Sequence, residues 1–317
     1  MTFTEIFEWY CDRAAAVQEA LRAVRAEADI EYGRLVEHDK RRDAVGMPVC
    51  QVVSMQNMSF KTAANGSHFL YKFRQHSISE QIDSLVKRTN RHYQWLLVEA
   101  YENFEDFLEF SYAAAAVVDR NHWPDSDYGS IGADDLKSVT FEGLLDQARM
   151  KGKKPQSFLN QLRIRLPLMQ RFEAENAINV NLWFCVNLIE KLRHHIVHTR
   201  GIVASSKNFK RQILEKCGLN NNGRPDKKYL EWIEMYVHKD DSAHVIHLLE
   251  VSLPAEGPIN WYMNKFDELS NSLLAYAHLI ASSFVALESA KPDRWGNKSQ
   301  IPYMDAPSMP GFFIQRC

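Results

Sequence analysis

The sequence predicts an all-α protein: an antiparallel helical bundle with a long N-terminal helix and a small irregular or β insertion. Several long stretches place apolar residues at steps of three and four, which is the spacing of an amphipathic helix. Glycine and proline gather in a few short segments between these stretches. The chain has 317 residues, of which 45% are hydrophobic, so it can bury a core without a disulfide or metal.

The first 70 residues, 1–70, are predicted to hold the N-terminal helix and a linker. Residues 4–40 are rich in Ala, Glu, Arg and Leu, which favour helix formation. The apolar residues of this helix form a broken stripe, which packs either on the main domain or on a partner chain. Residues 41–70 mix glycine, proline and β-branched residues, so a short strand or an irregular linker is expected there. The apolar stripe consists of Ile6, Tyr10, Val17, Leu21, Val24 and Ile30.

Residues 71–290 are predicted to form the bundle itself. Ser77 or Ser79 can cap its first helix, with Glu80 in the first turn. A shorter helix is expected at 141–150, and the stretch "AHVIHLLEVSLP" can form either a strand or a short helix. Four long amphipathic helices are expected to pack together, at residues 77–119, 155–170, 174–200 and 258–289.

Composition narrows the classes of protein to which the chain can belong. Its net charge is −2, so any contact with nucleic acid must come from a local patch. The five cysteines form no CxxC pair, which excludes a zinc ribbon and a disulfide framework. The N-terminus does not resemble a signal peptide and no run approaches 18 apolar residues, so we expect a cytoplasmic protein without a membrane span. The proline-containing segment 291–317 is expected to be a C-terminal tail, either irregular or docked on the domain as an arm.

The stretch "EKLRHHIVHTRGIV", residues 190–203, carries the clearest chemical signal. Glu190, His194 and His198 are each four residues apart, so they share one face of a helix. Arg193 precedes His198 by five residues, which places the two roughly 140° apart around the helix axis. The stretch therefore presents an arginine and two histidines along one edge of a helix end, directly before a helix-ending glycine.

An arginine and histidines in this arrangement suit cleavage of RNA through its own 2′-hydroxyl group. The guanidinium is a permanent cation whose planar fork matches a phosphate. An imidazole gives and takes protons near neutral pH. The imidazole would move a proton while the guanidinium stabilises charge on the phosphoryl oxygens, so this chemistry requires no metal and no other cofactor.

A basic strip upstream of the motif fits a phosphate-rich ligand. Residues 149–171 include seven basic residues and no acidic one. A solvated face balanced by acidic residues elsewhere would explain the strip equally well. The residues expected to contact RNA are Lys151, Lys153, Lys154, Arg163 and Arg165, together with Arg200 just beyond the motif.

The segment "RHHIVH" resembles the HEPN superfamily, whose members carry an Arg-x4-6-His motif at the end of a helix in an α-helical bundle. Arg193 and His198 match the ends of that motif, and His194 matches the polar residue that follows the arginine. The continuation "IVHTRGIV" and the upstream "EAYENFEDFLEF" are similar to other parts of family members. The resemblance covers roughly residues 75–290 and does not account for either end of the chain.

The resemblance implies a metal-independent endoribonuclease that acts as a toxin or an anti-phage defence effector. It implies a homodimer that places both motifs in one cleft, with an antitoxin or another defence-system protein as its partner. Arg193 and His198 would be catalytic, His194 would support them, and Glu190 could orient a histidine or an arginine. Members with a nucleotidyltransferase antitoxin often carry a tyrosine two residues after the histidine, where this chain has Arg200, so control by modification of that tyrosine is not expected.

Two other interpretations of the same residues stay open. Glu190, His194 and His198 could hold a zinc ion with a fourth ligand from elsewhere, which would make the protein a metal-dependent hydrolase. The pattern is not HExxH, and no second cluster of ligands stands out in the sequence. Alternatively, the bundle could be a non-catalytic binding or scaffold protein, whose histidines simply offset the dipole at a helix end.

Overall fold

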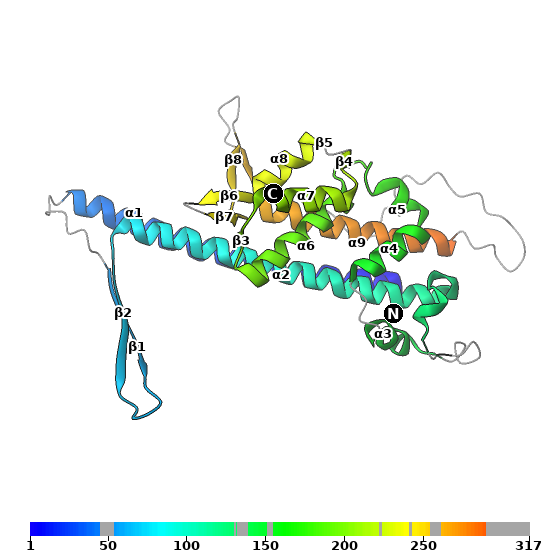
Figure 1. Ribbon diagram of the computed structural model, residues 1–317, viewed down its shortest axis with the longest axis horizontal. Helices are drawn as coiled ribbons and strands as arrows, with labels where there is room; N and C mark the ends of the chain where they lie inside the picture. The colour runs from blue at the N-terminus through cyan, green and yellow to red at the C-terminus, as the bar shows by residue number, and fades with distance from the viewer. Residues whose placement is uncertain are drawn as a thin grey trace, which may run out of the picture.

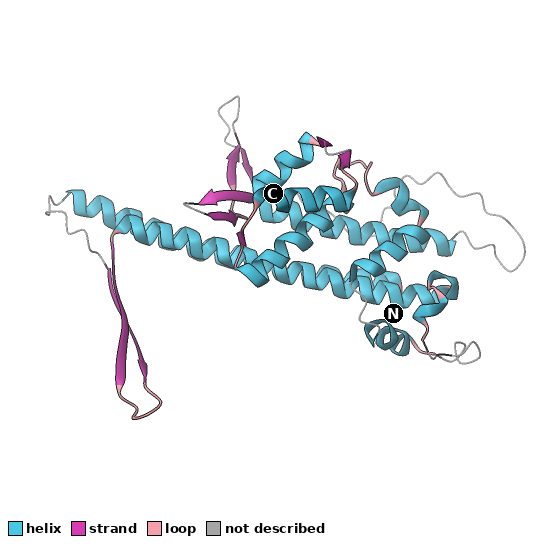
Figure 2. Ribbon diagram, viewed as in Figure 1, coloured by secondary structure: helices cyan, strands magenta, loops and turns pink. Residues whose placement is uncertain are grey.

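The computed structural model describes residues 1–44, 54–129, 131, 139–150, 155–221, 224–240, 243–253 and 261–289. Most of them are helical, as predicted, and small antiparallel sheets decorate the helices (Figure 2). The helices are α1 (Phe3–Ala44), α2 (Ile78–Val118), α3 (Phe141–Met150), α4 (Pro155–Arg165), α5 (Pro167–Phe172), α6 (Leu182–Thr199), α7 (Ser206–Cys217), α8 (Lys227–Tyr236) and α9 (Lys265–Ser289), with short 3-10 turns η1 (Arg120–His122) and η2 (Asp125–Asp127). The strands are β1 (Ser54–Lys61), β2 (His68–His76), β3 (Ile202–Val203), β4 (Asn220–Asn221), β5 (Arg224–Pro225), β6 (Val237–Asp240), β7 (Ala243–Ile246), β8 (Val251–Leu253) and β9 (Trp261–Met263).

Helices α1, α2, α6 and α9 surround one hydrophobic core (Figure 1). Helices α2 and α9 form the central pair, because each contacts the other and also contacts both α1 and α6. Tyr93 meets Phe266 and Phe104 meets Tyr276, so α2 and α9 run parallel to each other. Helices α1 and α6 run in the opposite direction, which makes neighbouring helices antiparallel around most of the bundle.

Helix α1 packs on the main domain through the apolar stripe that the sequence predicts. Phe3 stacks on Phe284 near the end of α9, and Gln18 donates to Asp267 near its start. Ile30, at the far end of the stripe, is exposed instead. The part of the stripe in the core consists of Ile6, Tyr10, Val17 and Leu21.

The helix predicted at residues 155–170 is in fact two helices, α4 and α5. Leu166 lies between them with φ −107° and ψ 102°, and Pro167 occupies the first turn of α5. The proline ring sterically excludes the preceding residue from the helical conformation, so α4 ends at Arg165. These two short helices cover α2 and α9, and α1 takes the fourth place in the bundle instead.

Helix α6 begins at Leu182 rather than at residue 174 because asparagine side chains build a loop before it. The carboxamide of Asn176 donates to the carbonyl of Val180 at 2.7 Å, and Asn179 adopts a left-handed φ of 54°. Asparagine side chains compete with the backbone in this way and favour turns over helix interiors. Asn181 then caps α6 by accepting a backbone N–H of the first turn.

Helix α2 begins with the cap that the sequence predicts. The hydroxyl of Ser77 accepts the backbone N–H of Glu80 at 3.2 Å, and the Glu80 carboxylate accepts the backbone N–H of Ser77 at 2.7 Å. This reciprocal pair satisfies two backbone donors that have no partner inside the helix. It fixes the point at which the chain enters the central helix of the bundle.

The insertion expected within residues 41–70 is a hairpin made of β1 and β2, and β2 continues to His76. The hairpin projects away from the bundle at the start of α2 (Figure 1). The stretch "AHVIHLLEVSLP" forms strands rather than a helix, with β7 at its start and β8 near its end. Strand β7 lies between β3 and β6 in a small antiparallel sheet next to the end of α6.

Helix α9 is long and apolar enough to cross a membrane if judged by length and composition alone. This differs from the sequence-based expectation that no run of the chain is long and apolar enough to span a membrane. More than half of the apolar window Lys265–Leu287 is buried, because it packs against α1, α2, α5 and α6. Its apolar character is therefore accounted for by its place at the centre of the bundle.

Two buried carboxamides of α2 hold the end of α6 and strand β7 together. Asn90 and Gln94 both donate to the backbone carbonyl of Ile246, at 2.8 and 2.7 Å, and Asn90 also accepts the backbone N–H of Leu248. The N–H of Ile246 donates to the carbonyl of Gly201, directly after α6. A buried donor or acceptor without its partner costs about 1–3 kcal/mol, so these bonds fix the position of the turn after α6.

A substitution at Gly201 tests this junction. Gly201 has φ +79°, and a Cβ there would lie 2.8 Å from the buried carboxamide of Gln94. We therefore expect Gly201→Ala to lower the free energy of unfolding by about 1–3 kcal/mol in urea denaturation, through backbone strain and disturbed hydrogen bonds. Gly33→Ala is the matched control: it lies in α1 with open space around it, and should raise stability by about 0.5–1 kcal/mol. A Gly201→Ala protein as stable as wild type would contradict this account.

Candidate functional site

The predicted motif lies on the last two turns of α6, where Arg193 faces α2. Its Nη2 donates to Glu102 Oε1 at 3.1 Å. The Arg193 side chain is 30% exposed and that of Glu102 is 55% exposed. The Nε of Arg193 is buried and finds no acceptor among the described residues. One side of this guanidinium is therefore paired with an exposed carboxylate, and another has a buried donor without an acceptor among the described residues.

His194 and His198 lie next to each other on the exposed side of α6. Their ring centroids are 4.7 Å apart and the rings are inclined by 51°. Burial, the neighbouring His198 and nearby cations lower the pKa of His194 below its ordinary value. His194 is therefore neutral at neutral pH and lies between Arg193 and His198 on the helix surface.

The third histidine of the motif, His195, lies edge-on to His194 at 5.6 Å and contacts the elements that follow α6. His195 Nδ1 lies 3.2 Å from the carbonyl of Ile202, and its ring packs edge-on against Phe209 of α7. Burial lowers the pKa of His195. This residue ties α6 to the following strand and to α7, so we assign it a structural role.

A hollow of about 580 Å³ lies beside the motif, between α2, α6 and α7. Glu190 Oε2 lies 2.5 Å from Lys216 Nζ, so this carboxylate binds a cation of α7. Burial raises the pKa of Glu105 to about 7, and nearby carboxylates add to the effect while Arg193 opposes it. The charged and titratable side chains that line the hollow are Glu105, Glu190, Lys191, Arg193, His194 and Lys216.

The zinc interpretation requires a set of three or more ligands in one place. Within the part of the chain that the structure describes, no group of three His, Cys, Asp or Glu side chains is arranged to hold a metal ion. Glu190, the first residue of the proposed ligand set, binds Lys216.

The basic strip predicted upstream lies at the other end of α6. Arg163 forms a two-pronged pair with Glu173, with both N–O distances at 2.7 Å, and lies over the ring of Trp183. Trp183 and His198 are separated by roughly 22 Å along the helix at about 1.5 Å per residue. Arg165 is exposed on α4. Lys151, Lys153 and Lys154 lie outside the described residues, and the structure does not bring Arg163 or Arg165 to the motif.

Arg200 lies at a second hollow, of about 700 Å³, on the other side of the end of α6. We name it the α2–β6 hollow, after two of the elements whose residues line it. Arg200 ends α6 in a left-handed conformation with φ 57°, directly before Gly201, so two successive residues make the predicted helix stop. The charged residues lining the α2–β6 hollow are Lys87, Arg88, Arg91, Arg200, Lys239 and Asp240.

A buried lysine lies behind this hollow, and no pattern in the sequence marks it. Lys265 is 1% exposed, and its Nζ lies 2.9 Å from His238 Nε2 and 3.5 Å from His247 Nδ1. The two imidazoles stack at 4.8 Å and both line the hollow. Burial lowers the pKa of Lys265 to about 8, and burial together with Lys265 lowers the pKa of His247 to about 4. At neutral pH the lysine carries the charge of this group and His247 is neutral.

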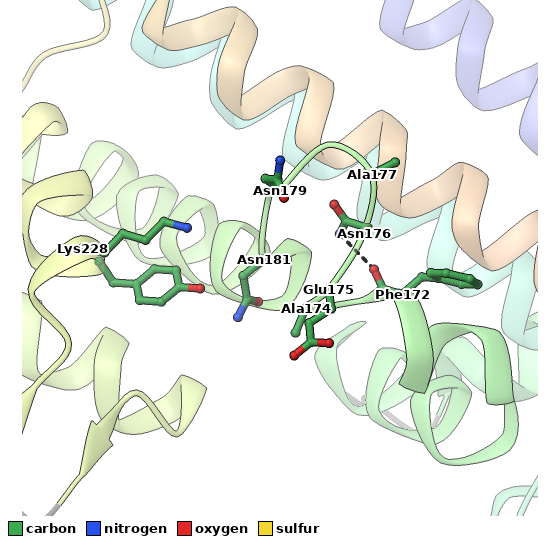
Figure 3. Close-up of a pocket in the computed structure, with 9 residues that line it drawn as sticks. Phe172, Ala174, Glu175, Asn176, Ala177, Asn179, Asn181 and Lys228 are labelled. Carbon is green, nitrogen blue, oxygen red and sulfur yellow. Dashed lines mark hydrogen bonds between the residues drawn. The ribbon is translucent and has the colours of Figure 1, made fainter.

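A third hollow, of about 450 Å³, lies at the loop between α5 and α6 (Figure 3). Asn176, Asn179 and Asn181 supply most of its side-chain amides, and Lys228 approaches from α8. The Asn176 carboxamide is used within the loop itself, and Asn181 caps α6. This hollow contains none of the residues predicted to be functional.

No family model, curated protein or solved structure matches the chain.

The raised pKa of Glu105 predicts how stability depends on pH. Because its pKa is about 7 in the folded protein and 4.5 ordinarily, the folded state binds a proton more tightly than the unfolded state. This carboxyl therefore makes the protein less stable as the pH rises from about 4.5 to 7. Glu105→Gln should remove that loss and raise the melting temperature at pH 8 more than at pH 5. Glu142→Gln, at an exposed position of α3, is the control, and equal shifts at both pH values would contradict the assignment.

Proposed function

We propose that this protein is a metal-independent endoribonuclease of the HEPN type, with Arg193 and His198 as its catalytic residues. The observation that carries the proposal is the arrangement at the end of α6. Arg193 and His194 line a hollow of about 580 Å³, and His198 contacts His194 on the exposed side of the helix. Groups that bind a phosphate and groups that move a proton thus lie within reach of one ligand.

Arg193 can exchange its present partner for an RNA phosphate. Its ion pair with Glu102 is partly exposed, and pairs of this kind contribute only about 0–1 kcal/mol. A phosphate can accept two guanidinium N–H groups at once, which adds to the strength and direction of the contact. The Nε of Arg193 has no acceptor among the described residues but is buried, so a two-pronged contact with the scissile phosphate would require the guanidinium to turn toward the hollow.

His198 would then act as the general acid or base. It is exposed, so the 2′-hydroxyl or the leaving oxygen of an RNA strand can approach its ring. In this proposal His194 supports His198 through the contact between their rings. Its lowered pKa keeps His194 neutral, so it adds no positive charge beside that of Arg193. Glu190 holds Lys216 at the edge of the hollow, where the ammonium can face the strand.

The proposal includes a homodimer, because one copy presents these groups on an open surface. A two-fold axis near the end of α6 would bring a second set of the same residues to face the first, and enclose the phosphate between them. Together with the resemblance of the motif, this arrangement favours a role as a cytoplasmic toxin or antiviral defence effector, held in check by an antitoxin or another partner protein.

Cleavage of RNA by the purified protein in excess EDTA tests the proposal. Wild type should cut RNA and leave 2′,3′-cyclic phosphate ends, and a substrate with 2′-deoxyribose at the cut position should resist. Arg193→Ala and His198→Ala should each lower the rate by at least about 100-fold. His38→Ala, at an exposed position of α1, is the matched control and should cleave as wild type does.

Two results would refute this mechanism. One is cleavage that survives both Arg193→Ala and His198→Ala. The other is cleavage that EDTA abolishes and a divalent metal restores, which would favour a metal-dependent hydrolase instead.

A further inference from the structure

We propose that the α2–β6 hollow is a binding site for a phosphate ester, held by Arg91, Arg200 and Lys239. This inference rests on the proposed function in one respect: in the nuclease, the ester is a backbone phosphate of the RNA strand next to the one that is cut. A free nucleotide carries the same chemical group, and the experiment below separates the two sources.

The first argument is the balance of charge in the hollow. Five basic side chains and one acidic side chain line it. Arg88 is taken up by Glu31 at 2.6 Å, and Lys87 lies 3.9 Å from Asp240, the single acid. For the other three cations, no carboxylate among the described residues comes within ion-pair distance. A cavity that gathers unpaired cations concentrates positive potential and attracts anions.

The second argument is that Arg91 and Arg200 are positioned together. Arg91 Nη2 lies 3.4 Å from the backbone carbonyl of Arg200, so the guanidinium of α2 is held against the turn that presents Arg200. The backbone turn at Arg200 and Gly201 is itself held in place by the buried carboxamides of α2. Like charges brought into one cavity repel each other unless an anion lies between them. A phosphate with several acceptor oxygens meets this requirement better than a single carboxylate.

The third argument comes from the floor of the hollow. His238 and His247 line it, and the Lys265 ammonium lies directly behind them. Lys265 has two imidazoles and no carboxylate as its neighbours in the described structure. A buried cation without a counter-ion is costly, so a bound anion in front of the imidazoles would stabilise it. The lowered pKa of Lys265 agrees with the absence of such a charge nearby.

The fourth argument is location. Arg200 is two residues beyond His198, so the hollow opens beside the proposed catalytic residues rather than at a remote face of the bundle. An extended strand that places one phosphate at Arg193 and His198 would pass the end of α6 and reach Arg200 and Arg91. The hollow thereby binds a neighbouring phosphate of the strand, which is not the phosphate that is cut.

Binding of a labelled oligoribonucleotide with 2′-O-methyl riboses tests the proposal, because it cannot be cleaved through a 2′-hydroxyl. The variant Arg91→Glu/Lys239→Glu reverses two exposed charges of the hollow. It should bind at least ~10-fold more weakly than wild type by fluorescence anisotropy, with a lower dependence of affinity on salt. Arg34→Glu, an exposed arginine of α1, is the control for a change of charge alone and should bind as wild type does. Circular dichroism checks each fold, and the Arg91→Ala/Lys239→Ala variant should show a smaller loss.

The same titration with ATP as the probe separates the two sources of phosphate. Loss of oligonucleotide binding in the charge-reversed variant assigns the hollow to the RNA strand. Loss of ATP binding with unchanged oligonucleotide binding assigns it to a free nucleotide, and unchanged binding of both probes overturns the proposal. If the wild-type protein never cleaves RNA but binds it through the charges of the hollow, the proposed binding site is supported and the proposed nuclease activity is refuted.

Discussion

The backbone carbonyl of Ile246, held by two buried carboxamides of α2, is the contact on which the arrangement at the end of α6 depends. Asn90 and Gln94 satisfy this carbonyl where water does not reach, and the N–H of Ile246 in turn binds the carbonyl of Gly201. Because buried polar groups are expensive to leave unpaired, the central helix, strand β7 and the turn after α6 hold one another in a single register. The α2–β6 hollow takes lining residues from all three of these elements, whereas the hollow of about 580 Å³ lies between α2, α6 and α7.

This register places the motif at a boundary between two electrostatic environments along α2. Toward the C-terminal half of that helix, Glu102 pairs with Arg193, and burial together with neighbouring carboxylates raises the pKa of Glu105. Toward its N-terminal half, basic residues line the α2–β6 hollow with Arg200. His198 lies between the two regions. In the proposed enzyme, this division would draw an RNA strand in from the basic side and leave only Arg193 to meet phosphate on the acidic side.

Local rules account for the features of the fold that the sequence analysis predicted correctly. The step of three and four residues marks α1, α2, α6 and α9, because burying one face of a helix requires that spacing whatever it packs against. The cap formed by Ser77 and Glu80 involves only neighbouring residues, so it can be recognised directly. Two of the three errors in helix bounds also have local causes: Pro167 excludes helix at Leu166, and the asparagines before Asn181 build a loop. Both of these local causes are visible in the sequence. The third error is the helix predicted at 258–289, which begins only at Lys265 because Trp261–Met263 pair with β8 as strand β9.

The sequence by itself determined that the chain is mostly helical, where its main helices lie, and that an arginine and two histidines share the end of one of them. Only the tertiary structure decided that α1, rather than residues 155–170, completes the bundle, since many amphipathic faces can satisfy one another. It also decided the hollow that joins Arg91, Arg200 and Lys239, and the burial of Lys265 behind two histidines. These residues are far apart in the chain and carry no common pattern. Their proximity follows from how helices and strands pack, which depends on contacts that local spacing does not encode.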